Sequence, residues 1–186
     1  MKLRLHIHKK KKLNVYEVDL YKIEFGHAED LLDAIDVDSM EFGSSEELEN
    51  CLSLTLKEKI SKIFPVITSI FGIPDEEFIY VRENELVKVI TVITSYALNE
   101  LSQCASNRKD KKGGSIASLY QILFELQITL CDKFKGLNPF ILRHETMKEV
   151  FLLIRRLNSV QDYGYEHVQG SKGEVIRRPA SDDSWF

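Results

Sequence analysis

The apolar positions of this chain follow two different periods, and each period predicts a kind of element. Leu3, Leu5 and Ile7 alternate with polar residues, four lysines at 9–12 interrupt the alternation, and it resumes from Leu13. Strict alternation around a charged turn predicts a β-hairpin at the N-terminus. Two strands alone are marginal in water, so the apolar face of this hairpin must pack on helices.

From residue 27 onward the apolar residues recur at intervals of three and four. This spacing predicts helices over 27–36, 46–71 and 83–101, with a short helical turn over 73–81. Ser45 stands before a run of acids, which is typical of an N-cap and a first helical turn. Inside the second helix, Pro65 is expected to bend or split the helix because proline lacks the backbone N–H.

The chain changes character after residue 104. Residues 105–115 contain two adjacent glycines and no large apolar residue, which is typical of a flexible linker. Helical spacing returns over 116–163 and predicts a helical hairpin, whose second arm opens with Asn138 as the cap and Pro139 at the first helical position. Residues 164–186 show no sustained period, and we expect an extended, flexible tail.

The predicted fold is therefore mainly α. A small N-terminal β-hairpin packs on a helical bundle in a domain of residues 1–104, followed by the linker, the helical hairpin and the tail. With 44% hydrophobic and 29% charged residues, the composition is that of a soluble globular protein. The apolar runs are shorter than the roughly 20 residues that cross a bilayer, and we expect no membrane association and a cytosolic protein.

Charge and cysteine content narrow the function classes. Residues 1–104 carry 12 Lys and Arg against 19 Asp and Glu, a net charge of −7, whereas residues 105–186 carry 13 against 10, a net charge of +3. We therefore expect the two parts to attract each other and expect no nucleic-acid partner. The cysteines, at 51, 104 and 131, are odd in number and far apart, which favours small buried thiols over disulfides.

No arrangement in the sequence indicates catalysis. We find no nucleophile with a base, no phosphate-binding glycine loop and no helical metal-ligand spacing. His6 and His8 could hold a metal together, but no third ligand is indicated, so we expect them to face solvent. His144 and Glu145 are expected at a helix start. The sequence thus predicts no enzyme, no cofactor and no metal.

The tail carries the residues that we single out for binding. The one tryptophan of the chain, Trp185, stands next to Phe186, and Arg177, Arg178 and Pro179 precede them. Aromatic pairs of this kind are unusual in inert tails. We expect these five residues to form a docking element, with the aromatic rings in a pocket of a partner and the arginines on its acids.

Taken in order, the chain resembles the tail assembly chaperones of siphophages. The opening hairpin, the acidic helix around Leu31 and the stretch Lys62–Gly72 are similar to the N-terminal domain of that family. The second part is similar to the extension of the longer family product, which arises by programmed ribosomal frameshifting. The segments that carry this second likeness are 136–143, 149–158 and 175–186.

The resemblance implies a function. A family member binds the tape measure protein and keeps it soluble, while the extension recruits subunits of the tail tube (major tail) protein, and self-association is possible. It acts in the cytoplasm of the infected bacterial host and is absent from the mature virion. Lys111-Lys112-Gly113 marks the site where a frameshift would fall. The alternatives are a structural tail component retained in the virion and a small DNA-associated regulator.

Overall fold

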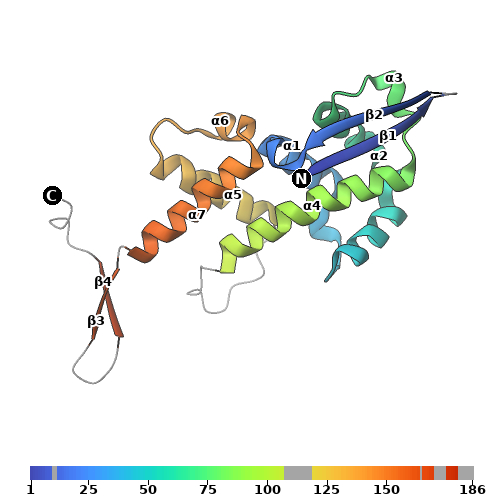
Figure 1. Cartoon of the computed structure of the whole chain (residues 1–186). Helices are drawn as coiled ribbons and strands as arrows, with labels where there is room; N and C mark the ends of the chain where they lie inside the picture. Colours follow the sequence, from blue (N-terminus) through green and yellow to red (C-terminus); the bar gives the residue numbers. More distant parts are fainter. Residues whose placement is uncertain (10–11, 107–118, 164, 170–174, 180–186) are drawn as a thin grey trace.

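The computed structural model describes residues 1–9, 12–106, 119–163, 165–169 and 175–179, with side chains given for 1–9, 12–103 and 121–157. Within these ranges it confirms a mainly α-helical fold that opens with a β-hairpin (Figure 1). The elements are β1 (Lys2–Lys9), β2 (Lys12–Asp19), η1 (Leu20–Lys22), α1 (Phe25–Ile35), η2 (Val37–Ser39), α2 (Ser45–Phe71), α3 (Asp75–Phe78), α4 (Glu83–Ser106), α5 (Leu119–Lys133), α6 (Pro139–His144), α7 (Met147–Tyr163), β3 (Tyr165–Gln169) and β4 (Val175–Pro179).

The N-terminal hairpin pairs β1 and β2 antiparallel, from Lys2 opposite Asp19 to Lys9 opposite Lys12. Its inner face is the predicted one, because the side chains of Leu3, Leu5 and Ile7 are buried. The outer edge of β1 lies along α4, where the backbone N–H of His6 donates to a carboxylate oxygen of Glu85 at 3.3 Å. The hairpin is thus completed by helices, as its marginal intrinsic stability requires.

The long helix α2 runs without interruption from Ser45 to Phe71. The expected split at Pro65 is wrong: the proline lies inside a continuous helix. Ser44, not Ser45, is the N-cap, since its hydroxyl accepts from the backbone N–H of Glu47 at 3.2 Å. At the other end Gly72 takes a φ of 62°, the left-handed conformation in which glycine ends helices without strain.

The first and third long helices differ from the predicted bounds by a few residues. Helix α1 begins at Phe25, two residues earlier than expected, and ends where Asp36 adopts a left-handed φ of 52°. Helix α4 continues to Ser106, beyond the expected end at residue 101. At the start of α1 the additional residues, Phe25 and Gly26, are buried, so the helix begins where its packing begins.

The second part contains one helix more than the expected hairpin. Asn138 caps α6 through its side chain, which accepts from the N–H of Ile141 at 3.0 Å, and Pro139 opens the helix as predicted. However, α6 ends at His144, so the prediction that His144 and Glu145 open a helix is wrong. Residues 165–169 and 175–179 of the tail pair as a second antiparallel hairpin, which the sequence did not indicate.

The buried side chains of both parts form one hydrophobic cluster. Residues of β1, α1, α2 and α4 share it with Leu126 and Leu130 of α5 and with Val150, Phe151 and Ile154 of α7. Figure 1 shows α5, α6 and α7 packed against α1 and α4, at the end opposite the tip of the first hairpin. The domain boundaries themselves stay a prediction. Among the described residues, no helix is long and apolar enough to cross a membrane.

Pro65 generates the first testable prediction. The proline is exposed and leaves the carbonyl of Ser61 without its helical hydrogen bond. We expect Pro65→Ala to raise the free energy of unfolding by about 1–3 kcal/mol, because alanine restores the missing donor. Urea unfolding followed by circular dichroism measures this, with Lys62→Ala, an exposed change in the same helix, as control. A loss of stability in Pro65→Ala would show that the proline shapes α2.

Candidate partner-binding site

An open apolar groove lies where α2, α3 and the start of α4 meet. Its volume is about 460 Å³. Leu56 and Ile60 line it from α2, and Leu86 lines it from α4. The remaining apolar wall comes from Phe78 at the end of α3 and from Ile79 and Val81 in the segment between α3 and α4.

The groove has a rigid floor and one unusually exposed apolar side chain. Phe78 packs edge-on against Phe64 of α2, with ring centroids 4.8 Å apart. The next residue, Ile79, keeps 75% of its surface exposed. Val81 is fixed by an antiparallel bridge to Ile7 of β1, so the short α3–α4 connection is held on the hairpin. A buried ring and an exposed isoleucine are thus presented side by side.

Two charges of opposite sign stand at the groove, Lys57 on α2 and Glu83 at the start of α4. The volume is in the range of pockets that bury a small ligand or a few side chains. An amphipathic helix can insert one or two apolar side chains there while its polar neighbours meet the two charges. This arrangement supports binding rather than bond chemistry.

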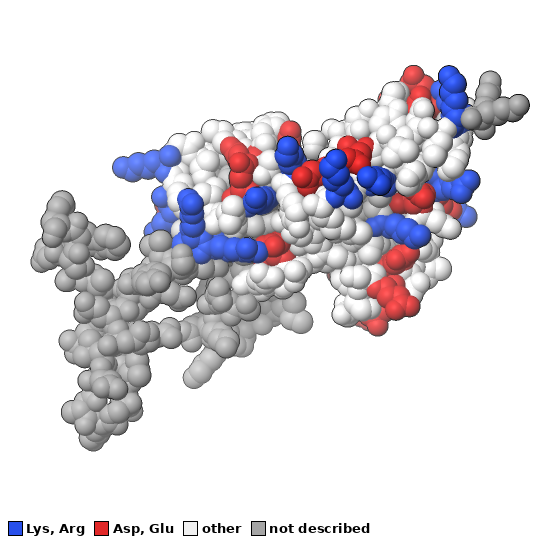
Figure 2. All heavy atoms as spheres, in the orientation of Figure 1, with Lys and Arg blue, Asp and Glu red and all other residues white. Residues whose placement is uncertain are grey.

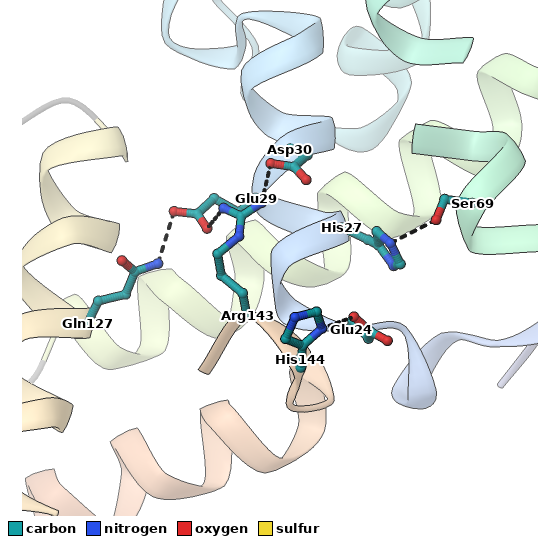
Figure 3. A network of polar contacts seen from close by, with 8 residues as sticks. All are labelled: Glu24, His27, Glu29, Asp30, Ser69, Gln127, Arg143 and His144. Atoms are coloured by element: carbon teal, nitrogen blue, oxygen red, sulfur yellow. Dashed lines mark hydrogen bonds and ion pairs between the residues drawn. The ribbon is translucent and has the colours of Figure 1, made fainter. Parts of the chain in front are cut away.

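A second feature, a polar clasp, joins the two parts of the chain (Figure 3). Arg143 of α6 donates from Nη1 to Glu29 at 2.7 Å and from Nη2 to Asp30 at 2.6 Å. Gln127 of α5 donates to the other oxygen of Glu29 at 2.9 Å. The negative charge of α1 therefore meets a cation of the second part, which is the attraction that the uneven charge predicted.

Backbone contacts close the same junction. The N–H of Phe25 donates to the carbonyl of Glu145 at 2.8 Å, and the N–H of Met147 donates to the carbonyl of Ile23 at 2.9 Å. Beside them Gly26 is needed for space, since a Cβ there would lie 2.9 Å from the carbonyl oxygen of Arg143. The segment after α6 is thus hydrogen-bonded to the segment before α1.

The clasp carries opposing electrostatic effects. Burial raises the pKa of Glu29, whereas the positive charge of Arg143 and the hydrogen bond from Gln127 oppose this rise. The two carboxylates, Asp30 foremost, raise the pKa of Arg143 above its ordinary value. The arginine is therefore always charged, and its charge offsets part of the free-energy cost of removing the Glu29 carboxylate from water.

The structure gives the position of three of the five predicted docking residues and does not test their role. Arg177, Arg178 and Pro179 lie in β4, opposite His167, Glu166 and Tyr165 of β3. Trp185 and Phe186 lie outside the described residues. The structure therefore places three of the five on one strand, and their role in binding a partner stays a prediction.

The histidines and cysteines differ from what we expected. His6 is half-buried, and its Nδ1 lies 2.8 Å from a carboxylate oxygen of Glu85, whereas His8 faces solvent. No cluster of three His, Cys, Asp or Glu that could hold a metal occurs among the described residues. Cys51 and Cys131 are free thiols but only half-buried, so the expectation of buried thiols is wrong for both.

One contact in the fold has the residue types of a catalytic dyad. The ring of His27 lies 3.0 Å, through Nε2, from the hydroxyl of Ser69 (Figure 3). A catalytic serine also needs an acid that orients the histidine. Within the described part of the chain no carboxylate bonds to Nδ1 of His27, and the serine lies within helix α2. We interpret the pair as a structural hydrogen bond that joins α1 and α2.

The clasp generates the second prediction. Arg143→Met keeps the aliphatic volume but leaves Glu29 buried without its cation, and we expect a loss of about 1–3 kcal/mol, discounted because Arg143 is partly exposed. Adding Glu29→Gln should restore part of this loss, since a neutral amide needs no cation. Urea unfolding measures both, and Lys135→Met, an exposed change between α5 and α6, is the matched control.

The pH dependence of the same variant has a defined sign. A folded-state pKa of Glu29 raised above its unfolded value means that the ionised form penalises folding. The deficit of Arg143→Met relative to wild type is therefore full at neutral pH and shrinks as the pH falls through the raised pKa. A deficit that grows in acid, or no rescue by Glu29→Gln, contradicts the role of the clasp.

Comparison of the chain with protein-family models, with curated proteins and with solved structures found no match. The resemblance to siphophage tail assembly chaperones therefore stays a prediction. The groove and the clasp are the features from which a function can be argued.

Proposed function

We propose that this protein is a tail assembly chaperone that binds apolar helical segments of a tape measure protein in the groove between α2, α3 and α4. The observation that carries the proposal is the exposed Ile79 above the buried Phe78, in an apolar groove with opposite charges, Lys57 and Glu83, among its lining residues. A long partner with many apolar helical stripes aggregates unless such stripes are covered. Each bound copy would cover one stripe.

The surface around the groove suits this task. Helix α3 carries three acids in its first turn, and α2 carries two. An acidic exterior keeps a coated partner soluble, because coats of like charge repel each other. The groove is an apolar site on this acidic surface, so it would bind only partner segments that carry an apolar stripe.

The position of α5–α7 refines the proposed mechanism. A freely tethered extension would raise the effective concentration of recruited tail tube subunits without a fixed direction. Here α6 packs on α1, α7 packs on α1 and α4, and α5 packs on α6 and α7. The clasp would therefore hold whatever follows α7 at a defined distance from the groove. We propose that recruitment of tail tube subunits falls to residues 175–186.

The groove generates the third prediction. Ile79→Asp places a charge where an apolar anchor is needed, and we expect at least a tenfold loss of affinity for a tape measure segment, since a hot-spot side chain contributes about 1.4 kcal/mol or more. Leu54→Asp is the matched control, because Leu54 is 83% exposed on α2 but does not line the groove.

The measurement is co-expression with the tape measure protein, followed by the soluble, co-purified fraction for wild type and both variants. Wild type and Leu54→Asp should keep the partner soluble, and Ile79→Asp should not. Equal solubility for all three excludes the groove. No rescue by wild type, together with the protein in purified virions, favours the structural tail component instead.

A further inference from the structure

A second pocket, about 320 Å³ in volume, lies at the junction of the two parts, between η1, α4 and α7. We refer to it as the junction pocket. The N-terminal part contributes the rings of Tyr21 and Tyr96 and the carboxylate of Glu100, whereas α7 contributes Lys148, Phe151, Leu152 and Arg155. The four residues of α7 are spaced by three, one and three, so they form one stripe along the helix.

The wall of the junction pocket is aromatic. The ring of Tyr96 packs edge-on against Tyr21, with centroids 5.6 Å apart, and against Phe151, with centroids 6.1 Å apart. Tyr21 and Leu152 remain 40% and 43% exposed. Aromatic walls that are partly open favour a further aromatic side chain, because edge-on ring contacts are stabilising beyond the burial of apolar area.

The same pocket is basic at one side. Arg155 pairs with the buried Glu100 of α4. Lys148 has no ion-pair partner among the residues whose side chains are described. On the face shown in Figure 2, Lys and Arg side chains gather over α7. An occupant that fits this pocket therefore combines aromatic rings with acids.

The second hairpin returns the chain to the end of α7. Strand β3 follows α7, and β4 pairs antiparallel with it, so that Pro179 lies opposite Tyr165. Paired residues of this kind are about 5 Å apart. The chain beyond Pro179 therefore starts close to the C-terminal end of α7, which is Tyr163.

The distance from this point to the pocket is short. Arg155, the pocket residue of α7 nearest to Tyr163, precedes it by eight positions, which at 1.5 Å per residue is about 12 Å along the helix. The step from Pro179 across to Tyr165, with the two residues from Tyr165 back to Tyr163, adds at most about 12 Å. Seven residues, 180–186, span at most about 25 Å when extended. The end of this segment can therefore reach the Arg155 side of the junction pocket of its own chain.

The composition of that segment matches the pocket. Residues 180–186 read Ala-Ser-Asp-Asp-Ser-Trp-Phe. Asp182 and Asp183 supply two negative charges, and Trp185 and Phe186 supply two rings. Trp185 is the one tryptophan of the chain.

We propose that residues 180–186 dock into the junction pocket of the same chain. The ring of Trp185 packs against Tyr21, Tyr96 and Leu152, and the aspartates lie near Lys148 and Arg155. Because the pocket is built from both parts, the docked segment also strengthens the contact between α4 and α7. A tail tube subunit that captures the same aromatic rings has to displace them from this pocket.

Trp185 itself reports the test, since its fluorescence can be excited selectively in the full-length chain. We expect blue-shifted emission and weak acrylamide quenching in wild type. Leu152→Asp should shift the emission to the red and raise quenching several-fold. Phe124→Asp, at a more exposed apolar site on α5 (57% against 43% for Leu152), should change neither.

Charge reversal separates docking from simple destabilisation. Lys148→Glu should raise quenching, and the combination with Asp182→Lys and Asp183→Lys should lower it again, which a merely structural effect does not produce. Emission typical of a solvated indole in wild type overturns the proposal. So does a blue shift that disappears on dilution, because a contact within one chain does not depend on concentration.

Discussion

The packing of α7 on the N-terminal helices is the contact on which the rest of the structure depends. Phe151 lies edge-on to both Phe25 of α1 and Tyr96 of α4, each with ring centroids 6.1 Å apart. Its burial, with that of Val150 and Ile154, turns two amphipathic halves into one hydrophobic cluster. Apolar burial supplies the energy but little direction. The clasp of Arg143 with Glu29 and Asp30 supplies the direction, since a guanidinium satisfies two carboxylates only in a narrow range of geometries.

The elements that the sequence predicts well are those whose cause is local. Alternation reveals the face of β1, spacing by three and four reveals α2 and α4, and Asn138 before Pro139 reveals the start of α6. The errors at Ser45 and His144 also have local causes. Either of two adjacent serines can cap a helix, and a His-Glu pair between two helices can end one helix or begin the next. Packing decides between these alternatives. The pairing of β3 with β4 depends on backbone hydrogen bonds, which the side-chain pattern of polar strands does not indicate.

The candidate sites depend on contacts that no local pattern contains. Glu29 and Arg143 are 114 residues apart, and each alone is an ordinary surface charge in a helix. Ile79 follows Phe78 in a short segment whose exposure is set by α2 and β1. Only the opposite net charges of the two parts indicated that they attract each other. Net charge does not identify the residues that make the contact. Sequence reasoning could therefore lead to the hypothesis that the protein binds a partner, but it could not locate the groove.

The groove and the junction pocket use different physics, and this difference bears on how the protein would work. The groove is mainly apolar, so binding there strengthens in salts that promote burial. Docking in the junction pocket draws on exposed charges, Lys148 among them, which salt screens over about 10 Å at 0.1 M. Because α4 contributes to both sites, the same helix would connect the proposed partner-binding groove to the segment that we propose to dock. If the protein is a chaperone, it would hold its partner through the groove while the segment beyond β4 is exchanged between its own pocket and an incoming subunit.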